Sequence, residues 1–343
     1  MKKCLLLLCS ILFLANLETA RATAHAFIWD STDGFRDLGS LGVDSIAFAV
    51  NDSGTVTGYY VPVDKFYQHG FVWTAATGMV DIGIPGGGDS TTAVCQPTAI
   101  NAAGHIVGYG RQVDGTQVAF YWTSTEGFTT LGTLSGSPDN GNTAYAINDL
   151  DQVTGNLRFR RSPSYHAYLW SPGMPAPRDL GTVDGGDYSV GYGINNSGRI
   201  VGSLVASNSS VWQAMNWTRQ SGMTILGTIP DSIYAQGVAV NDAGQAIGIN
   251  FTDTSDVGFY KSAHGEIKFL KGLGGNIIYA TEINQQGIII GSATDTTGKT
   301  KAVMWPTPGS RPVELETLDP AFSTASVYGI NNLGQIVGEY FPQ

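Results

Sequence analysis

The sequence predicts an all-β protein, a seven-bladed β-propeller with four strands in each blade. Three observations lead to this prediction. A short motif recurs seven times at intervals of 43 to 50 residues, each interval has room for four short strands, and no stretch has the 3.6-residue apolar period of a helix. The 45 glycines among 343 residues fit a chain with many turns. An open β-solenoid is the alternative architecture that such a period allows.

The recurring motif is an Ile or Val followed by Asn, with a glycine seven residues after the Asn. Its asparagines are Asn51, Asn101, Asn148, Asn195, Asn241, Asn284 and Asn331. Six copies have a second glycine three residues after the Asn, and Asp151 replaces it in the third copy. Asn can open a tight turn and Gly can take its left-handed position, so the motif predicts a hairpin between the first and second strands of each repeat. Two residues before the Asn, six copies have Ala or Gly, as expected for strands that converge on an axis.

An aromatic block predicts the third strand of each repeat, because it alternates with period two and is rich in β-forming residues. Its copies begin at His25, His69, Val118, His166, Gln213, Val257 and Lys301, and six of them end in Trp. We expect these tryptophans to pack between neighbouring blades. A short apolar segment, often Asp-Leu-Gly, follows each block and is expected to be the fourth strand.

The His-Ala-Phe start at His25 to Phe27 and its repeated variants resemble the extracellular HAF repeat family. The resemblance covers essentially all of residues 25–343. It implies an exported repeat protein and brings no established activity or catalytic residues.

The order of the motifs at the two ends predicts how the ring of blades closes. Residues 25–39 supply a third and a fourth strand, whereas residues 325–340 supply a first and a second strand. These four strands are expected to share one sheet, so that N-terminal strands complete the last blade.

The N-terminus predicts a secretory signal peptide over residues 1–24, followed by one propeller domain over residues 25–343. Lys2 and Lys3 precede an apolar run that ends at Ala15, which is shorter than the ~20 residues of a membrane span. Ala22-Thr23-Ala24 then predicts cleavage before His25. We therefore expect a protein secreted to the periplasm or the medium, with no membrane anchor.

Charge, cysteine content and histidine positions limit the classes of partner and of site that we expect. The formal net charge of −10 argues against nucleic acid as a partner. Cys95 is the one cysteine left after the predicted cleavage, so we expect a monomer without disulfides, with Cys95 buried rather than nucleophilic. No nucleophile-elbow motif is present. His25, His69 and His166 occupy equivalent positions in different blades, so we expect no metal site and no cofactor.

Candidate ligand-binding residues come from two sets of loops on one face. Six linkers from a fourth strand to the next first strand carry an aspartate: Asp44, Asp89, Asp139, Asp187, Asp231 and Asp319. They would surround the channel mouth and hold a cation or a polyhydroxy ligand, or each would cap its own turn. The variable loops between second and third strands add Phe66, Tyr67, Arg111, Phe159, Arg161 and Trp212. Aromatic rings beside Arg suit sugar stacking or a protein contact, unless these loops only pack their own aromatics.

These observations favour a non-catalytic binding module whose ligand, a glycan or a protein, sits on this loop face and not on the hairpin face. The alternative is a propeller-type glycoside hydrolase or lyase that uses carboxylates at the channel mouth. A carboxylate with a raised pKa inside a deep pocket would favour the enzyme, whereas aspartates bonded to backbone would favour the binding module.

Overall fold

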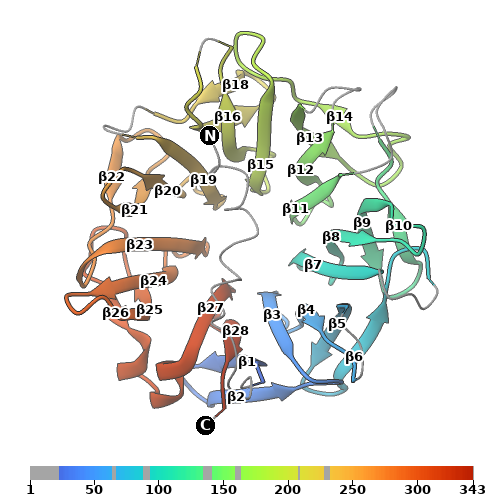
Figure 1. The fold of residues 1–343 in the computed structure, drawn as a ribbon, viewed down its shortest axis with the longest axis vertical. Coiled ribbons are helices and arrows are strands. Elements are labelled where there is room, and N and C mark those ends of the chain that lie inside the picture. Colours follow the sequence, from blue (N-terminus) through green and yellow to red (C-terminus); the bar gives the residue numbers. More distant parts are fainter. Residues whose placement is uncertain are drawn as a thin grey trace.

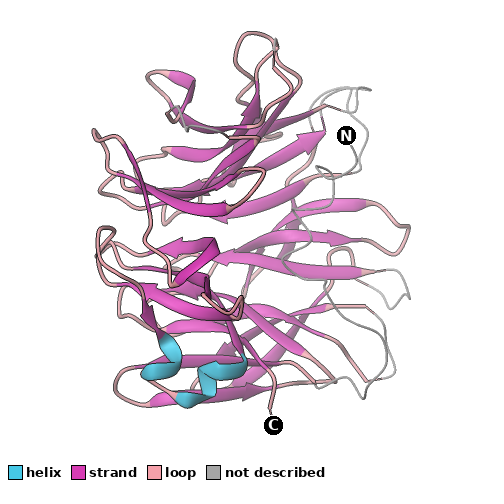
Figure 2. Ribbon diagram, turned by 60° about the vertical axis from the view of Figure 1, so that its left-hand side comes forward, coloured by secondary structure: helices cyan, strands magenta, loops and turns pink. Residues whose placement is uncertain are grey.

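The computed structural model describes residues 23–63, 67–87, 93–133, 141–158, 164–207, 209–227 and 232–342. Regular structure in these residues is almost entirely β-strand, which confirms the all-β prediction. The helical elements within the described residues are two short 3-10 helices, η1 (Leu315–Thr317) and η2 (Pro320–Thr324) (Figure 2). None of the helices in this part of the chain is long and apolar enough to cross a membrane.

The strands form successive antiparallel units of four. The first three units are β3 (Ser45–Val50), β4 (Val56–Tyr60), β5 (His69–Thr74) and β6 (Gly78–Gly83); β7 (Val94–Ile100), β8 (Ile106–Arg111), β9 (Gln117–Thr123) and β10 (Gly127–Thr130); and β11 (Thr143–Ile147), β12 (Val153–Arg158), β13 (Tyr165–Trp170) and β14 (Arg178–Asp179). Figure 1 shows the units arranged around a common centre, with the first strand of each unit innermost.

The next three units follow the same order. They are β15 (Tyr188–Ile194), β16 (Ile200–Val205), β17 (Gln213–Thr218) and β18 (Gly222–Ile225); β19 (Tyr234–Val240), β20 (Ala246–Phe251), β21 (Asp256–Lys261) and β22 (Ile267–Phe269); and β23 (Gly274–Ile283), β24 (Ile289–Asp295), β25 (Thr300–Trp305) and β26 (Val313–Glu314). A single parallel pair joins the β11 unit to the β15 unit, and another joins the β19 unit to the β23 unit.

The strands from the two ends of the described chain lie in one sheet. Its strands are β1 (His25–Asp30), β2 (Gly34–Gly39), β27 (Ala325–Ile330) and β28 (Ile336–Tyr340), in the order β2-β1-β28-β27. His25 pairs with Tyr340 and Trp29 pairs with Ile336. The predicted pairing of residues 25–39 with residues 325–340 is therefore present.

The first and second strands of each unit form the predicted hairpin. Each of these hairpins also contains a β-bulge that was not predicted from the sequence. The extra residue stands three positions before the Asn, as Phe48 does between Ala47 and Ala49. The bulge explains the glycine seven residues after the Asn. A Cβ on Gly202 would lie 1.8 Å from the carbonyl oxygen of Val190, and at the equivalent glycines the distance is at most 2.2 Å. No side chain fits there without moving the backbone.

The glycine three residues after the Asn has a different reason. These glycines all have positive φ, as in Gly54 at 75° and Gly198 at 76°. Their backbone N–H closes the turn onto the carbonyl of the Asn, at 3.0 Å for Gly54 and Asn51. Asp151 adopts the same conformation with φ 56°, which is unfavourable for a residue with a side chain.

The histidine and aspartate of the two recurring outer motifs bind each other. His25, His69 and His166 place Nδ1 3.0, 3.1 and 3.0 Å from carboxylate oxygens of Asp37, Asp81 and Asp179. Each of these aspartates also accepts a 2.7 Å hydrogen bond from the N–H of the glycine two residues later. Both motifs thus act together to join the third strand to the fourth. The described residues contain no cluster of three or more His, Cys, Asp or Glu that could hold a metal.

The tryptophans of the aromatic block pack where units meet, as predicted. Trp73 belongs to a buried cluster with Ile28 and Val337 of the neighbouring sheet. The Trp170 ring lies 5.5 Å from the Tyr121 ring of the preceding unit. Cys95 is buried and unpaired, and burial raises the pKa of its thiol, which fits the expected apolar role.

Candidate functional site: an axial cavity and a row of aromatic rings

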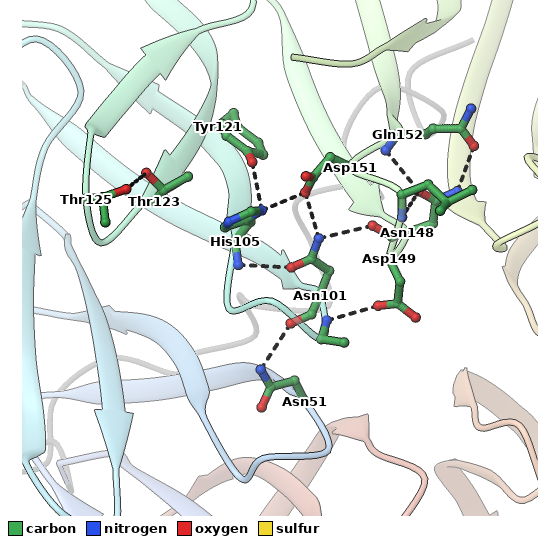
Figure 3. A network of polar contacts seen from close by, with 12 residues as sticks. Asn51, Asn101, His105, Tyr121, Thr123, Thr125, Asn148, Asp149, Asp151 and Gln152 are labelled. Atoms are coloured by element: carbon green, nitrogen blue, oxygen red, sulfur yellow. Dashed lines mark hydrogen bonds and ion pairs between the residues drawn. The ribbon is translucent and has the colours of Figure 1, made fainter.

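The seven motif asparagines form a closed ring of hydrogen bonds at the hairpin end of the molecule. Each Nδ2 donates to the backbone carbonyl of the next motif asparagine: Asn51 to Asn101 (3.0 Å), Asn101 to Asn148 (3.2 Å), Asn148 to Asn195 (2.8 Å), Asn195 to Asn241 (2.9 Å), Asn241 to Asn284 (3.0 Å), Asn284 to Asn331 (3.1 Å) and Asn331 to Asn51 (2.9 Å). Figure 3 shows the first of these bonds. We call this set the asparagine ring.

The other polar atom of these side chains is also used. The Oδ1 of Asn195, for example, accepts from the N–H groups of Ser197 and Arg199 in its own turn. The asparagines are buried, and a buried amide that is bonded at both ends has little capacity left for a ligand. The asparagine ring therefore holds neighbouring units together.

The residues that follow the motif asparagines form a second, exposed ring, called here the outer ring. In each bond a backbone N–H donates to the next side chain: Ala102 to Asp149, Asp149 to Asn196, Asn196 to Asp242, Asp242 to Gln285, Gln285 to Asn332 and Asn332 to Asp52. The step from Asp52 to residue 102 is missing because alanine has no acceptor in its side chain. The outer ring is therefore open at one point.

A cavity of about 510 Å³ lies on the axis inside these rings. Its wall is built by the innermost strands, and at the level of the bulges the wall is uneven. Four of the bulged residues are aromatic, namely Phe48, Tyr145, Tyr192 and Tyr328, whereas the other three are Thr98, Val238 and Thr281. The predicted site residues Asp44, Tyr67, Arg111, Asp187, Trp212 and Asp319 are not part of this wall.

Glu282 on β23 brings a carboxyl group into the wall of the cavity. It stands two residues before Asn284, where the other six copies of the motif have Ala or Gly. Its Oε1 accepts from the N–H of Ile283 at 2.9 Å, and burial raises the pKa of the carboxyl group to about 7. Glu282 was not among the site residues predicted from the sequence. The departure from a small residue was the signal that could have identified it.

The tyrosines around the cavity differ in their partners. The Tyr279 hydroxyl donates to Asp256 at 2.6 Å, and the Tyr328 hydroxyl donates to Glu339 at 2.7 Å. The Tyr192 hydroxyl is buried close to Tyr145 and Tyr234. Its burial raises the pKa of the phenol well above the usual range, so it stays a neutral donor at physiological pH.

Two of the three predicted aspartates that the structure describes, Asp44 and Asp319, accept hydrogen bonds from backbone N–H groups. Asp44 accepts from the N–H of Ala24 at 2.9 Å. Asp319 caps η2 by accepting from Ala321 and also accepts from Phe35. Asp187 is exposed immediately before β15. Six predicted residues lie outside the described parts of the chain: Asp89, Asp139, Asp231, Phe66, Phe159 and Arg161.

The predicted aromatic and basic residues have separate positions. Tyr67 is buried, with its ring 5.6 Å from the His69 ring, and Arg111 is exposed at the end of β8. Trp212 lies half-buried between Tyr188 and Tyr234, with centroid distances of 5.7 and 5.8 Å.

Trp212 is part of a longer row of rings at the loop end, which is the end opposite the hairpins. From Tyr234 the row continues to Phe251 at 5.2 Å and from there to Tyr279 at 6.2 Å. We call Tyr188, Trp212, Tyr234, Phe251 and Tyr279 the aromatic row. It crosses three units, and its last member also lines the axial cavity. Tyr188 and Tyr234 each begin an innermost strand, and this shared position was a signal that the sequence analysis did not use.

Asp151, the residue that replaces a turn glycine, connects two units (Figure 3). Its Oδ1 accepts from Nδ2 of Asn101 at 2.8 Å and lies 2.7 Å from Nδ1 of His105. The Tyr121 hydroxyl lies 2.8 Å from the same His105 nitrogen. Burial and the nearby carboxylate raise the pKa of Tyr121. The strained turn thus gains contacts to the preceding unit that glycine could not make.

Comparisons with known proteins bear on the fold. No family model matches the sequence, and neither does any curated protein, so the resemblance to the HAF repeat family stays a prediction. A mutant of puromycin hydrolase complexed with PGG is similar with a TM-score of 0.54 at 10% identity, over 89% of this chain and 52% of that chain. TolB from Acinetobacter baumannii has a TM-score of 0.46 at 14% identity, over 71% of this chain and 65% of that chain.

A TolB-like structure from Agrobacterium tumefaciens has a TM-score of 0.48 at 10% identity, over 94% of this chain and 99% of that chain. This chain thus spans only part of puromycin hydrolase and of the Acinetobacter protein. TolB and other β-propellers are among the similar structures, and at such identities the likeness concerns the fold alone.

Proposed function

We propose that the chain is a seven-bladed β-propeller that acts as an exported binding module for a glycan or a protein. The asparagine ring supports the blade count, because its bonds pass from unit to unit and return from Asn331 to Asn51. The sheet shared by β1, β2, β27 and β28 supports a last blade that is completed by N-terminal strands.

The aromatic row is the observation that carries the binding function. Its rings are neighbours at 5.2 to 6.2 Å and are only partly buried, so each keeps part of its surface exposed. Pyranose rings stack on aromatic faces through their C–H bonds, and a row can engage consecutive sugar residues of one chain. A glycan is therefore the ligand that this surface fits better than a protein.

The test is binding of polysaccharides by Trp212→Ala and Tyr234→Ala variants, first on a glycan array and then by calorimetry. Loss of an aromatic anchor should weaken binding by at least tenfold for each variant. Phe269→Ala is the matched control, because Phe269 is an exposed aromatic residue on β22, outside the row. The proposed glycan site is wrong if the folded variants bind polysaccharide as tightly as the parent protein does. It is also wrong if the parent protein binds proteins but no polysaccharide.

Glu282 is the observation that favours the second candidate, a glycoside hydrolase or lyase at the channel. A carboxyl group with a pKa near 7 suits a general acid, and the carboxyl group of Asp242 in the outer ring lines the same cavity. The test is the release of reducing ends or unsaturated products from polysaccharides. Product that is absent from the Glu282→Gln variant would establish catalysis.

Export is the other part of the proposal, and the contacts of Ala24 bear on where the signal peptide would be cleaved. Ala24 is buried, donates to Asp44, and accepts from the N–H of Ser45 at 2.8 Å. Cleavage before His25 would remove both bonds, whereas cleavage after Ala22 would keep them. N-terminal sequencing of protein from the medium or periplasm decides between a start at His25 and a start at Thr23. An intact Lys2-Lys3 end on all of the protein would contradict export.

A further inference from the structure

The wall of the axial cavity combines aromatic and smaller residues at the level of the bulges. Aromatic residues form two packed pairs, Phe48 with Tyr328 at 5.5 Å and Tyr145 with Tyr192 at 5.1 Å between ring centroids. The side of β19 and β23 has the smaller Val238 and Thr281 at this level. In the order of the innermost strands (Figure 1), Thr98 of β7 separates the two aromatic pairs on one side, and Val238 of β19 and Thr281 of β23 separate them on the other. Glu282 of β23 therefore lies on the part of the wall between the two aromatic pairs, with Tyr328 on the neighbouring strand β27.

The carboxyl group of Glu282 has no cation to pair with. Lys, Arg and His do not occur among the residues that line the cavity in the described structure. Its Oε1 is bonded to the N–H of Ile283, and no other hydrogen bond of this side chain is present among the described residues. Keeping such a group in a position that six other repeats fill with Ala or Gly is costly unless a ligand pairs with it.

We propose that the axial cavity binds a small organic cation, with its ammonium group paired to Glu282 and its alkyl groups packed against the aromatic residues of the wall. Aromatic faces attract ammonium groups through their quadrupole, and the attraction grows when water is excluded. A volume of about 510 Å³ falls within the range of small-molecule sites. A metal ion would need several oxygen ligands, whereas an organic cation needs one carboxylate and apolar surface.

This site is separate from the aromatic row and does not depend on a glycan ligand. Tyr279 is the residue common to both, and its hydroxyl is already bonded to Asp256. Loss of glycan binding in the Trp212→Ala variant would leave cation binding intact, and the reverse holds for variants of Glu282. The two proposals can therefore fail independently.

The test measures binding of choline by calorimetry, with the neutral isostere 3,3-dimethyl-1-butanol as the reference ligand. We expect the parent protein to bind choline at least tenfold more tightly than the isostere, because only choline pairs with the carboxylate. Glu282→Gln keeps the size of the side chain and should lower the affinity for choline at least tenfold without changing that for the isostere. Glu266→Gln, at an exposed carboxylate, is the control that should bind as the parent does.

The pH profile adds a second readout. The other titratable groups lining the cavity are Asp52, Asp149 and Asp242 in the outer ring and the phenols of Tyr145, Tyr192, Tyr279 and Tyr328. Aspartates titrate well below neutral pH and phenols well above it. A rise in choline affinity centred near pH 7, absent in Glu282→Gln, therefore reports on Glu282. The proposal is overturned if choline does not bind the folded parent protein, if the isostere binds equally well, or if Glu282→Gln binds choline as the parent does.

Discussion

The hairpin end and the loop end of this molecule use repetition in opposite ways. At the hairpin end every unit supplies the same asparagine, and the seven side chains bind one another until the ring closes at Asn331 and Asn51. At the loop end the aromatic row crosses only three units, and apart from Tyr188 and Tyr234 its members come from different positions in the repeat. The repeated asparagines are buried and hydrogen-bonded to one another, whereas the aromatic residues of the row remain partly exposed.

The same contrast holds within the hairpin end. Glu282, Ala102 and Asp151 are departures from the repeat, and each changes the local chemistry. Glu282 adds a carboxyl group to the cavity, Ala102 opens the outer ring, and Asp151 adds a contact to His105. In a repeat protein, positions that break the pattern are therefore the first place to look for a site, because the pattern itself is fixed by packing and backbone geometry.

The largest effect is expected for Gly202→Ala. The new methyl group would lie 1.8 Å from the carbonyl oxygen of Val190, so the bulged strand must move, at a cost of about 3 kcal/mol or more in the free energy of unfolding. Gly309→Ala is the control, because a Cβ added there would have no atom within 4 Å and the φ of Gly309 is not positive. Urea denaturation of both variants measures the difference. Equal stabilities would mean that the bulge is not a rigid constraint.

Asn195→Ala should cost slightly less, about 2–3 kcal/mol, because it removes the bond to the carbonyl of Asn241 and leaves two N–H groups of its own partly buried turn without partners. Asn276→Ala is the loop-end counterpart. Asn276 is exposed and donates one hydrogen bond to the carbonyl of Thr254, so its loss should cost about 0.5 kcal/mol. The contrast between the two ends disappears if both variants unfold at the same urea concentration.

More of the fold than of the candidate site could be predicted from the sequence. Spacing and composition were enough for the all-β fold, the hairpins and the sheet shared by both ends, because hairpin turns and strand alternation are local properties. The bulge was not predictable, since it depends on how the carbonyl of Val190 approaches Gly202 in three dimensions. The aspartates were chosen for their recurrence, but Asp44 and Asp319 use their oxygens on backbone N–H groups. Trp212 was found because its loop is variable.

Glu282→Gln should stabilise the protein in a pH-dependent way. The pKa of Glu282 is raised from 4.5 to about 7 in the folded protein, so the folded state holds its proton more tightly than the unfolded state. Stability then falls as pH rises from about 4.5 to about 7 and stays lower above that range. The uncharged glutamine avoids this loss, which gives a gain of up to about 3 kcal/mol at pH 8 and little change at pH 4. Urea denaturation at both pH values measures it, and a gain that is equal at both would contradict burial of an ionisable group.

The smallest effect, Ala102→Asn, tests whether the outer ring stabilises the hairpin end by its continuity. The new amide oxygen at position 102 would accept from the N–H of Asp52, which is the one missing bond of the outer ring. Because the site is exposed, the gain should be about 0.5–1 kcal/mol. Ala103→Asn places the same side chain in the same turn but outside the ring, so it corrects for the turn preference of asparagine. Asn332→Ala makes the reverse change, because it removes the acceptor for Gln285 and a donor to Asp52. If the outer ring acts as one unit, Ala102→Asn should raise the free energy of unfolding, and Asn332→Ala should lower it, by more than the exposed hydrogen bonds gained or lost would contribute separately. If the bonds are independent, both variants should change the free energy of unfolding by similar small amounts.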